Sequence, residues 1–244
     1  MKHGCEICIS KSKGFFCGLA PEILEKVDTH KMNRTYKKGE VLYHDGASVD
    51  GVYCIQSGKI KIMRLNEVGK EAIFKIVSTG DLLGHYKLFD QASSYKFTAV
   101  ALETSRVCFL DKKFILEHVE NYPDLALKLI KKISQDSQTT EFKFTSLLHK
   151  NVRERLAELL FAFAQSYGVM EEDRIRLDIR LTREELSSMI GTVNETVTRF
   201  MTEFKNEGII EEEDRNIYIT DREKLMLFAN IKDGNDQIYK TFRF

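Results

Sequence analysis

The sequence lacks a long hydrophobic run, an excess of charge of either sign and more than a few cysteines. No apolar stretch approaches the roughly 18 residues that cross a membrane. No apolar region follows the charged first residues, so we expect neither a membrane segment nor a secretory signal. These absences favour a cytoplasmic protein, in which five cysteines are more typical of thiols or metal ligands than of structural disulfides. The balance of 37 basic and 37 acidic residues indicates nothing about nucleic acid.

The 244 residues are long for one compact domain, and their pattern changes along the chain. Between Tyr36 and Leu110, short β-type segments alternate with seven glycines at positions 39 to 84, which is typical of an antiparallel barrel or jelly roll. From Phe114 to Tyr167 there is one proline and no glycine, which predicts helices. Two short helices and a hairpin at 208–220 follow, the order of a winged helix-turn-helix. The expected fold class is α+β.

The predicted helix before residue 150 carries a seam, which we define as seven positions spaced by alternating steps of four and three. The seam is apolar at both ends and polar at its centre. Its positions are Ala126, Ile130, Ile133, Ser137, Thr140, Phe144 and Leu147. One alternative is a helix that packs only on its own β-domain. A seam this long ahead of a separate domain favours pairing with a second copy, so we predict a homodimer.

The first helix of the expected helix-turn-helix begins at a capping box, Thr182-Arg-Glu-Glu185. Its buried stripe is expected to comprise Leu186, Met189 and Ile190. Gly191 ends this helix, because glycine accepts the left-handed conformation that a tight turn requires.

The second helix is expected to run to Phe204 with Thr192 as its cap. The residues expected to face inward are Val193, Val197, Phe200 and Phe204. The residues left on the outer face are Asn194, Glu195, Thr198 and Arg199. A recognition helix contacts base edges from this position. Arginine donates two hydrogen bonds to guanine and glutamate accepts one from cytosine, so Glu195 and Arg199, one turn apart, suit adjacent base pairs.

Two alternatives compete with base contact by Glu195. Thr192-x-x-Glu195 is itself a capping box, so the glutamate can close its own helix. Glu195 and Arg199 are also spaced for an ion pair on the helix surface. Moreover, residues 150–231 hold 12 basic and 17 acidic residues, whereas a general nucleic-acid binder is basic. DNA binding is therefore predicted from the motif alone, with weak non-specific binding.

Five motifs together resemble a known family, over nearly the whole chain. They are Lys38-Gly39-Glu40, Ile55-Gln-Ser-Gly-Lys-Ile60, Gly80-Asp81-Leu-Leu-Gly84, Arg155-Leu-Ala157 and Glu195-Thr-Val-Thr-Arg199. The sequence is similar to the CRP/FNR superfamily, named for the cyclic-AMP receptor protein and the fumarate–nitrate reductase regulator. The resemblance implies a cyclic-nucleotide-binding-like β-roll that senses a signal, a long dimerisation helix and a C-terminal winged helix-turn-helix. It also implies a palindromic promoter site on double-stranded DNA, RNA polymerase as a partner and no enzymatic activity.

The resemblance also assigns roles and ranges. In the family, the positions matching Glu195 and Arg199 contact a G·C-containing core in each half-site, and Thr198 stands at a specificity position. Together with these, we expect Thr182, Thr192 and Asn194 at the DNA. The expected ranges are 1–18 for a cysteine-bearing segment, 19–119 for the β-roll, 120–149 for the dimerisation helix, 150–232 for the DNA-binding domain and 233–244 for a tail.

The positions that bind cyclic nucleotides in this superfamily are altered here. Those members carry a glutamate after the glycine matching Gly84, and an arginine followed by a small residue for the phosphate. This chain has His85 and Lys96-Phe97 instead. Lysine lacks the bidentate fork of arginine, so cyclic AMP is not the expected ligand. We expect His85 to be an ordinary polar residue.

The cysteines indicate another signal. Cys5, Cys8, Cys17 and Cys108 resemble the four ligands of the iron–sulfur branch of the family, which implies a [4Fe–4S] cluster and an oxygen or redox response that acts through dimerisation. Eight residues separate Cys8 from Cys17, three more than is usual in that branch. The alternatives are a zinc site that includes His3, a thiol switch, unligated cysteines or another small ligand. Cys54 is expected to be a small core residue.

A thiol oxidoreductase that uses Cys5-x-x-Cys8 is a further alternative. That motif normally opens a helix within a thioredoxin-like fold, and no such pattern surrounds it in this sequence.

Overall fold

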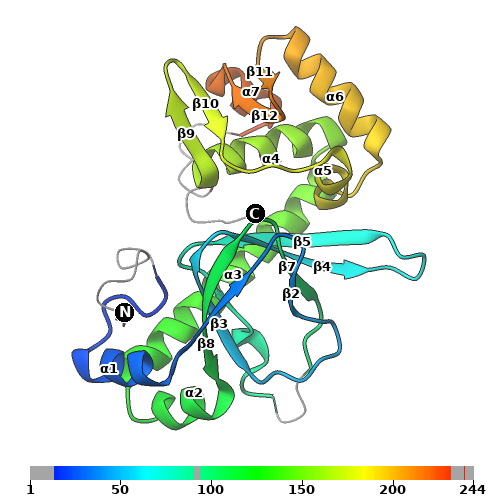
Figure 1. Cartoon of the computed structure of the whole chain (residues 1–244). Coiled ribbons are helices and arrows are strands. Elements are labelled where there is room, and N and C mark those ends of the chain that lie inside the picture. Colours follow the sequence, from blue (N-terminus) through cyan, green and yellow to red (C-terminus); the bar gives the residue numbers. More distant parts are fainter. Residues whose placement is uncertain (1–13, 91–93, 232–238, 240–244) are drawn as a thin grey trace. The chain divides into compact units, whose positions relative to one another are not determined.

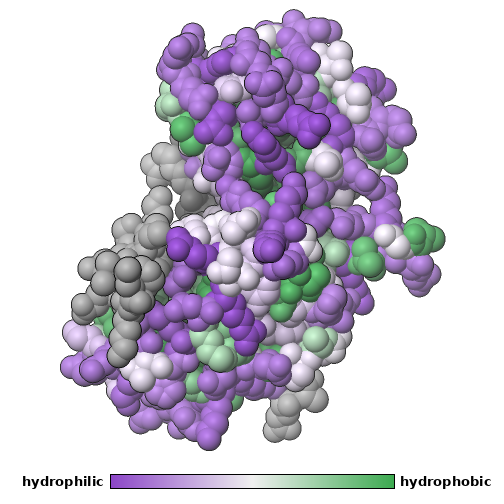
Figure 2. All heavy atoms as spheres, in the orientation of Figure 1, coloured by the Kyte–Doolittle hydropathy of each residue, from purple (hydrophilic) through white to green (hydrophobic). Residues whose placement is uncertain are grey.

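The computed structural model describes residues 14–90, 94–231 and 239 (Figure 1). The chain divides into two compact units. The first comprises residues 1–70 and 74–134, and the second comprises residues 71–73 and 135–244. Within the described ranges, no helix has the length and hydropathy needed to cross a membrane. Hydrophilic residues predominate on the face that Figure 2 shows.

The first unit is a β-roll, as the glycine-punctuated segments predict. Its strands are β1 (Met32–Tyr36), β2 (Val41–Tyr43), β3 (Gly51–Ser57), β4 (Lys59–Leu65), β5 (Glu71–Ser78), β6 (Leu82–Leu83), β7 (Thr98–Ala101) and β8 (Ser105–Asp111). In the described chain they form two sheets, ordered β1-β8-β3-β6 and β2-β7-β4-β5. Gly58 joins β3 to β4 at a φ of 94°, and a Cβ there would lie 2.7 Å from the Cα of Ser105. No other residue fits this turn.

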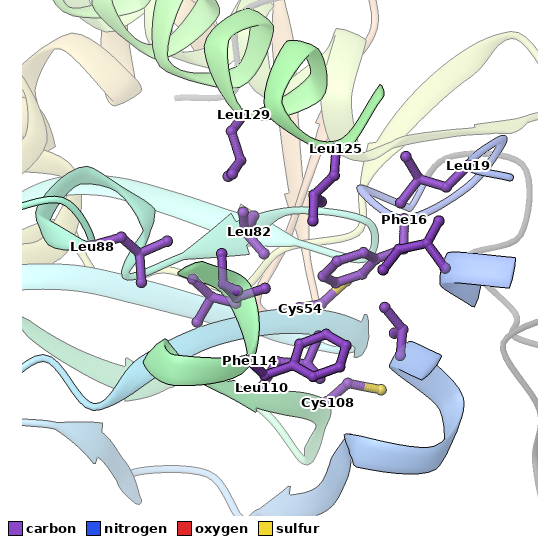
Figure 3. Packing of buried hydrophobic residues seen from close by; sticks show 14 residues of the cluster. Phe16, Leu19, Cys54, Leu82, Leu88, Cys108, Leu110, Phe114, Leu125 and Leu129 are labelled. Carbon is purple, nitrogen blue, oxygen red and sulfur yellow. The ribbon is translucent and has the colours of Figure 1, made fainter. Parts of the chain in front are cut away.

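The sheet β1-β8-β3-β6 has two buried faces. Alternate residues such as Tyr53, Ile55 and Val107 point into the interior of the roll. The intervening residues, including Val52 and Leu110, pack instead against helices α1 (Pro21–His30) and α2 (Lys112–Val119) and the start of α3 (Pro123–His149) (Figure 3). We call this second set the helix-facing layer. It comprises Phe16, Leu19, Ile23, Val27, Val52, Cys54, Leu82, Leu88, Cys108, Leu110, Phe114, Ile115, Leu125 and Leu129.

Helix α3 confirms the helix predicted through the seam. Its inner face contributes Leu125 and Leu129 to the helix-facing layer. The seam lies on a different face, where Ile130, Phe144 and Leu147 are 61%, 62% and 50% exposed. Ser137 and Thr140, at the polar centre of the seam, are exposed as well. A long helix with several half-exposed apolar side chains in one row is suited to pairing with another helix.

The second unit confirms the predicted order of helices and the predicted hairpin. Its elements are α4 (Val152–Tyr167), β9 (Gly168–Glu171), β10 (Arg174–Leu177), α5 (Arg183–Ile190), α6 (Asn194–Asn206), β11 (Ile210–Glu213), β12 (Asn216–Ile219) and α7 (Arg222–Phe228). In the described chain the strands are ordered β11-β12-β10-β9. The β9–β10 hairpin was not predicted, because its turn uses Glu172 at a φ of 55° rather than the glycine or asparagine that marks such turns.

Candidate DNA-binding surface and cysteine site

The start and end of α5 match the prediction. The backbone N–H of Glu185 donates to Thr182 Oγ1 at 3.1 Å, and the N–H of Thr182 donates to Glu185 Oε2 at 3.0 Å. Leu186 and Ile190 are buried, with Met189 half-buried, as predicted. Gly191 is left-handed, with φ of 67°, and ends the helix. These local interactions fix the turn from which α6 emerges.

The start of α6 corrects two predictions. The helix begins at Asn194 and its cap position is Val193, which makes no side-chain cap. Thr192 does not cap the helix, because it lies one residue before the cap position; its N–H donates to the carbonyl of Ser187 at 3.0 Å. Val193 does not face inward either, and is 51% exposed. The buried stripe of α6 comprises Val197, Met201 and Phe204, with Phe200 half-buried.

The outer face of α6 carries the four predicted polar residues, which we call the recognition face. Asn194, Glu195, Thr198 and Arg199 are all exposed. The hydroxyl of Thr198 donates to the carbonyl of Asn194 at 3.0 Å. In the described chain, Glu195 is engaged neither in a capping box nor in an ion pair with Arg199, whose guanidinium lies 4.8 Å from the ring of Phe200. Both structural alternatives for Glu195 are therefore unrealised in this structure.

Two arginines at the start of α4 hold the helix pair in place. Arg155 Nε donates to the carbonyl of Ile190 at 3.0 Å, and Arg155 Nη1 donates to the carbonyl of Lys150 at 2.7 Å. The guanidinium of Arg153 lies 3.7 Å from the ring of Phe228 and pairs with Glu203 on α6 at 2.6 Å. The sequence marked Arg155 only as a family motif. Its structural role is to bind the carbonyl left open at the end of α5.

Carboxylates on and beside the sheet of this unit are paired with arginines. Arg174 Nη1 pairs with Glu211 at 2.7 Å and with Glu213 at 2.9 Å. Hydrogen bonds from Arg174 lower the pKa of Glu213, and the same bonds raise the pKa of Arg174. Arg176 pairs with Glu171 at 2.6 Å, and Arg183 pairs with Glu212. These three arginines are each paired with carboxylates of the same domain.

Cys17 lies in a turn that is bound to α3. The N–H of Cys17 donates to the carbonyl of Gly14 at 2.9 Å. Lys128 Nζ, on α3, donates to the carbonyl of Phe15 at 3.2 Å and also to that of Cys17. Burial lowers the pKa of Lys128. Cys5, Cys8 and His3 lie outside the described residues. Within the described ranges, no group of three histidine, cysteine or acidic side chains is placed to bind a metal.

Cys108 lies in the helix-facing layer on β8, with Cys54 directly opposite on β3 (Figure 3). Its register partner on the other side is Asn33 of β1. Gln56 Nε2 donates to Cys108 Sγ at 2.7 Å, and Cys108 Sγ donates to Asn33 Oδ1 at 3.3 Å. Cys54 is buried, as predicted. Its place opposite Cys108 could not be found from sequence, because no local signal fixes the register of strands so far apart.

The altered nucleotide positions lie in the same unit. His85 is buried, with 1% exposure, and begins a short 3-10 helix, His85–Lys87, after left-handed Gly84. His85 is therefore a buried residue rather than the ordinary polar residue that the sequence predicted. Phe97 stacks on Phe74 with ring centroids 4.9 Å apart, and Lys96 Nζ donates to Ser94 Oγ at 3.2 Å. Phe97, at the position where the resemblance leads one to expect a small residue, is therefore half of an aromatic pair.

Comparisons with known proteins agree with this architecture. Residues 33–122 match the family model "Cyclic nucleotide-binding domain" and residues 154–228 match "Crp-like helix-turn-helix domain". The chain is 26% identical over 212 residues to the CRP-like cAMP-activated global transcriptional regulator of Mycobacterium tuberculosis, covering 87% of this chain and 94% of that protein. It is 29% identical over 242 residues to Electron transport regulator A of Shewanella oneidensis, covering 96% and 94%.

Solved structures share the fold. FixK2 from Bradyrhizobium japonicum superposes with a TM-score of 0.71 at 20% identity, covering 81% of this chain and 96% of that one. A β-roll, a long helix and a helix-turn-helix in one chain define a class of two-domain DNA-binding regulators. This chain belongs to the CRP/FNR family of transcription regulators.

Proposed function

We propose that this protein is a homodimeric transcription regulator that binds a palindromic promoter site and responds to oxygen or redox state through a cysteine-bound iron–sulfur cluster. The observation that carries the proposal is the recognition face, four exposed polar side chains on the second helix of a helix-turn-helix. Glu195 and Arg199 on that face are not engaged with each other, so both are available to bases. The chemistry suits a cytosine acceptor contact and a bidentate guanine contact.

The geometry of the site supports dimerisation. One recognition helix fills one major-groove segment, and two such helices related by a two-fold axis bind half-sites about one helical turn apart. The exposed apolar ends of the seam, around Ile130 and Phe144, supply the pairing surface. A homodimer would thus bind an inverted repeat. RNA polymerase is the expected partner of the promoter-bound dimer.

The proposed cluster ligands are Cys5, Cys8, Cys17 and Cys108. The surroundings of Cys108 suit such a group, because its sulfur lies in an apolar layer and accepts an N–H from Gln56. Hydrogen bonds of this kind to cysteine sulfur tune iron–sulfur centres. When bound, the cluster would supply a redox-sensitive link between the N-terminal segment and β8. The resemblance to the iron–sulfur branch supports the ligand set, as does the grouping of cysteines at one end of the chain.

Lys128 connects the turn that contains Cys17 to the helix that carries the seam. It binds the carbonyls of Phe15 and Cys17 from α3, between the seam positions Ala126 and Ile130. A change of position at Cys17 would therefore act on the helix that carries the seam. The polar centre of the seam at Ser137 and Thr140 keeps the dimer from being unconditional, so a few kcal/mol can shift the balance between its states.

Purification without air tests the proposal. Wild-type protein is expected to be brown, to contain iron and sulfide, and to lose its colour in air. Selection from randomised duplex DNA with the same sample is expected to enrich an inverted repeat. The serine variants Cys5→Ser, Cys8→Ser, Cys17→Ser and Cys108→Ser should each lose the iron, while Cys54→Ala, the matched control, should keep it. Enrichment of no common sequence would overturn DNA recognition, and protein free of iron after anaerobic reconstitution would overturn the cluster.

A second candidate is a regulator of the same family that senses a small ligand or thiol redox state without a cluster. The relative in Mycobacterium tuberculosis is named for activation by cAMP. The match to a cyclic nucleotide-binding domain model also supports a small ligand as the signal. His85 and the Phe74–Phe97 stack argue against a cyclic nucleotide. Calorimetric titration with cyclic AMP and cyclic GMP distinguishes the candidates, since heat of binding would favour the ligand-sensing form.

A further inference from the structure

The cross-strand pair of cysteines has a chemistry of its own. Cys54 on β3 is the register partner of Cys108 on β8. Both side chains lie in the helix-facing layer, with exposed fractions of 6% and 7%. We propose that Cys54 and Cys108 form a redox-active dithiol, which closes to an intramolecular disulfide when the protein meets a low-molecular-weight disulfide.

The backbone already places the two residues within bonding range. Register partners in an antiparallel sheet have Cα atoms about 4.5–5.5 Å apart. A disulfide accepts Cα separations of about 4.4–6.8 Å. The bond between Cys54 and Cys108 can therefore form while β3 and β8 remain paired in the sheet, with only a small approach of the two strands. The third described cysteine, Cys17, lies in a turn and has no strand register with either residue.

The same sheet makes the bond easy to reduce. Opposed side chains in a sheet keep their Cβ atoms about 4.5–5.5 Å apart, whereas a relaxed disulfide prefers about 3.5–4.5 Å. Closing the bond draws β3 and β8 together against the packing on both faces of the sheet. Strained disulfides have higher reduction potentials than structural ones. The pair therefore suits a reversible modification rather than a permanent cross-link.

Polar side chains adjoin the pair on one side. Gln56 follows Cys54 by two residues and lies at the point where the register between β3 and β8 shifts. Gln56 Nε2 donates to Cys108 Sγ at 2.7 Å and to Asn33 Oδ1 at 3.2 Å. An amide donor stabilises the negative charge that sulfur carries while it attacks or leaves a disulfide. The amide of Gln56 thus supports Cys108 as the sulfur that attacks first.

The reaction balances with oxidised glutathione as the oxidant. Cys108 attacks one glutathione sulfur, which breaks the glutathione S–S bond and releases one glutathione thiol. The thiol of Cys54 then attacks the mixed disulfide at Cys108 and releases the second glutathione. Two protein thiols are oxidised to one disulfide, and their two protons leave with the two reduced glutathiones. This chemistry does not require an iron–sulfur cluster, although a closed disulfide would withdraw Cys108 from the proposed ligand set.

Peptide mapping of the full chain tests the dithiol. Trypsin leaves Cys54 in peptide 39–59, Cys108 in peptide 107–112, Cys17 in peptide 14–26 and the pair Cys5 and Cys8 in peptide 3–11. Wild-type protein purified in air is treated with oxidised glutathione, alkylated, and digested without reductant. The expected product joins 39–59 to 107–112, is about 2 Da lighter than the two reduced peptides together, and disappears on reduction with dithiothreitol.

Cysteine variants identify the two residues that form the disulfide and distinguish the disulfide from the proposed cluster. The same cross-link should form in Cys5→Ser, Cys8→Ser and Cys17→Ser, and should be absent from Cys54→Ala, which still carries iron when prepared without air. Wild-type protein in which both peptides remain fully alkylated would overturn the proposal. A cross-link from 107–112 to 14–26 or 3–11 would overturn it as well. Because the main measurement uses wild-type protein, a variant that fails to fold does not remove the test.

Discussion

The recognition face and the helix-facing layer differ in how their residues are held. Asn194, Glu195 and Arg199 are exposed on α6 and are supported by a helix pair beneath them. Cys108 and Leu110 are packed within a buried layer between a sheet and three helices. Replacing an exposed side chain usually changes stability by about 0.5 kcal/mol or less, whereas replacing a buried one costs several times more. Substitutions on the recognition face are therefore expected to change DNA binding with little effect on stability, whereas substitutions in the helix-facing layer are expected to destabilise the first unit.

The largest effect on stability is expected for a fully buried side chain compared with an exposed one. Leu110→Ala in the helix-facing layer should lower the free energy of unfolding by about 2–5 kcal/mol, because a buried leucine leaves a cavity. Leu65→Ala, at a leucine that is 54% exposed on β4, should change it by about 0.5 kcal/mol or less. Denaturant titration of both full-length variants measures the difference. Equal losses would mean that the layer is not a close-packed core.

Phe144→Glu should break dimerisation without unfolding the chain. The phenylalanine is 62% exposed on the seam, so the new charge is tolerated by the monomer but repelled across a paired interface. Sedimentation velocity should show a shift toward monomer, together with weaker operator binding. Leu227→Glu, at a position 76% exposed on α7, is the matched control and should remain dimeric. A fully dimeric Phe144→Glu variant would place the interface elsewhere.

Glu195→Ala and Arg199→Ala should each weaken operator binding by about 1–3 kcal/mol, since each removes a side chain that discriminates between bases. Both variants should also relax specificity at particular positions of the operator. The unfolding free energy should hardly change, since both side chains are exposed. Lys205→Ala removes the same charge as Arg199→Ala from the last turn of α6 and serves as the control. Fluorescence anisotropy on a panel of single-base operator variants makes the measurement, and uniform weakening on every sequence would assign the two residues a structural role.

The smallest effect concerns the charged sheet of the second unit. Hydrogen bonds from Arg174 hold the pKa of Glu213 below its usual value of 4.5, so Arg174→Ala should raise that pKa toward 4.5. A lowered carboxyl pKa contributes stability above pH 4.5, and that stability is lost as the pH falls through the lowered value. Carboxyl NMR titration of both proteins measures the shift. An unchanged pKa would indicate that the ion pair does not form in solution.

Local signals in the sequence predicted much of the second unit. The Thr182–Glu185 box, left-handed Gly191 and the exposed residues of α6 were all predicted from spacing alone. The cap of α6 was predicted one residue too early, because threonine is a preferred cap residue, whereas the backbone puts Val193 at the cap position. The turn at Glu172 was missed because it adopts a positive φ without glycine or asparagine.

Contacts between segments far apart in the chain could not be predicted from the sequence. The register that opposes Cys54 to Cys108, and the reach of Lys128 to the carbonyl of Cys17, depend on how distant segments pack. The seam was predictable as a pattern, and its exposure on α3 agrees with that pattern. The domain ranges, all of the DNA contacts, the role of the seam in dimerisation and the cluster ligands remain predictions.

Control of operator binding by the state of the cysteines is open to a direct titration. The dissociation constant for the selected inverted repeat is measured by anisotropy without air, again after exposure to air, and for Cys108→Ser in both conditions. We expect air to weaken binding by wild-type protein at least about tenfold, or about 1.4 kcal/mol, and Cys108→Ser to bind weakly in both conditions. Equal affinity of wild-type protein before and after air would contradict a cysteine-based control of DNA binding.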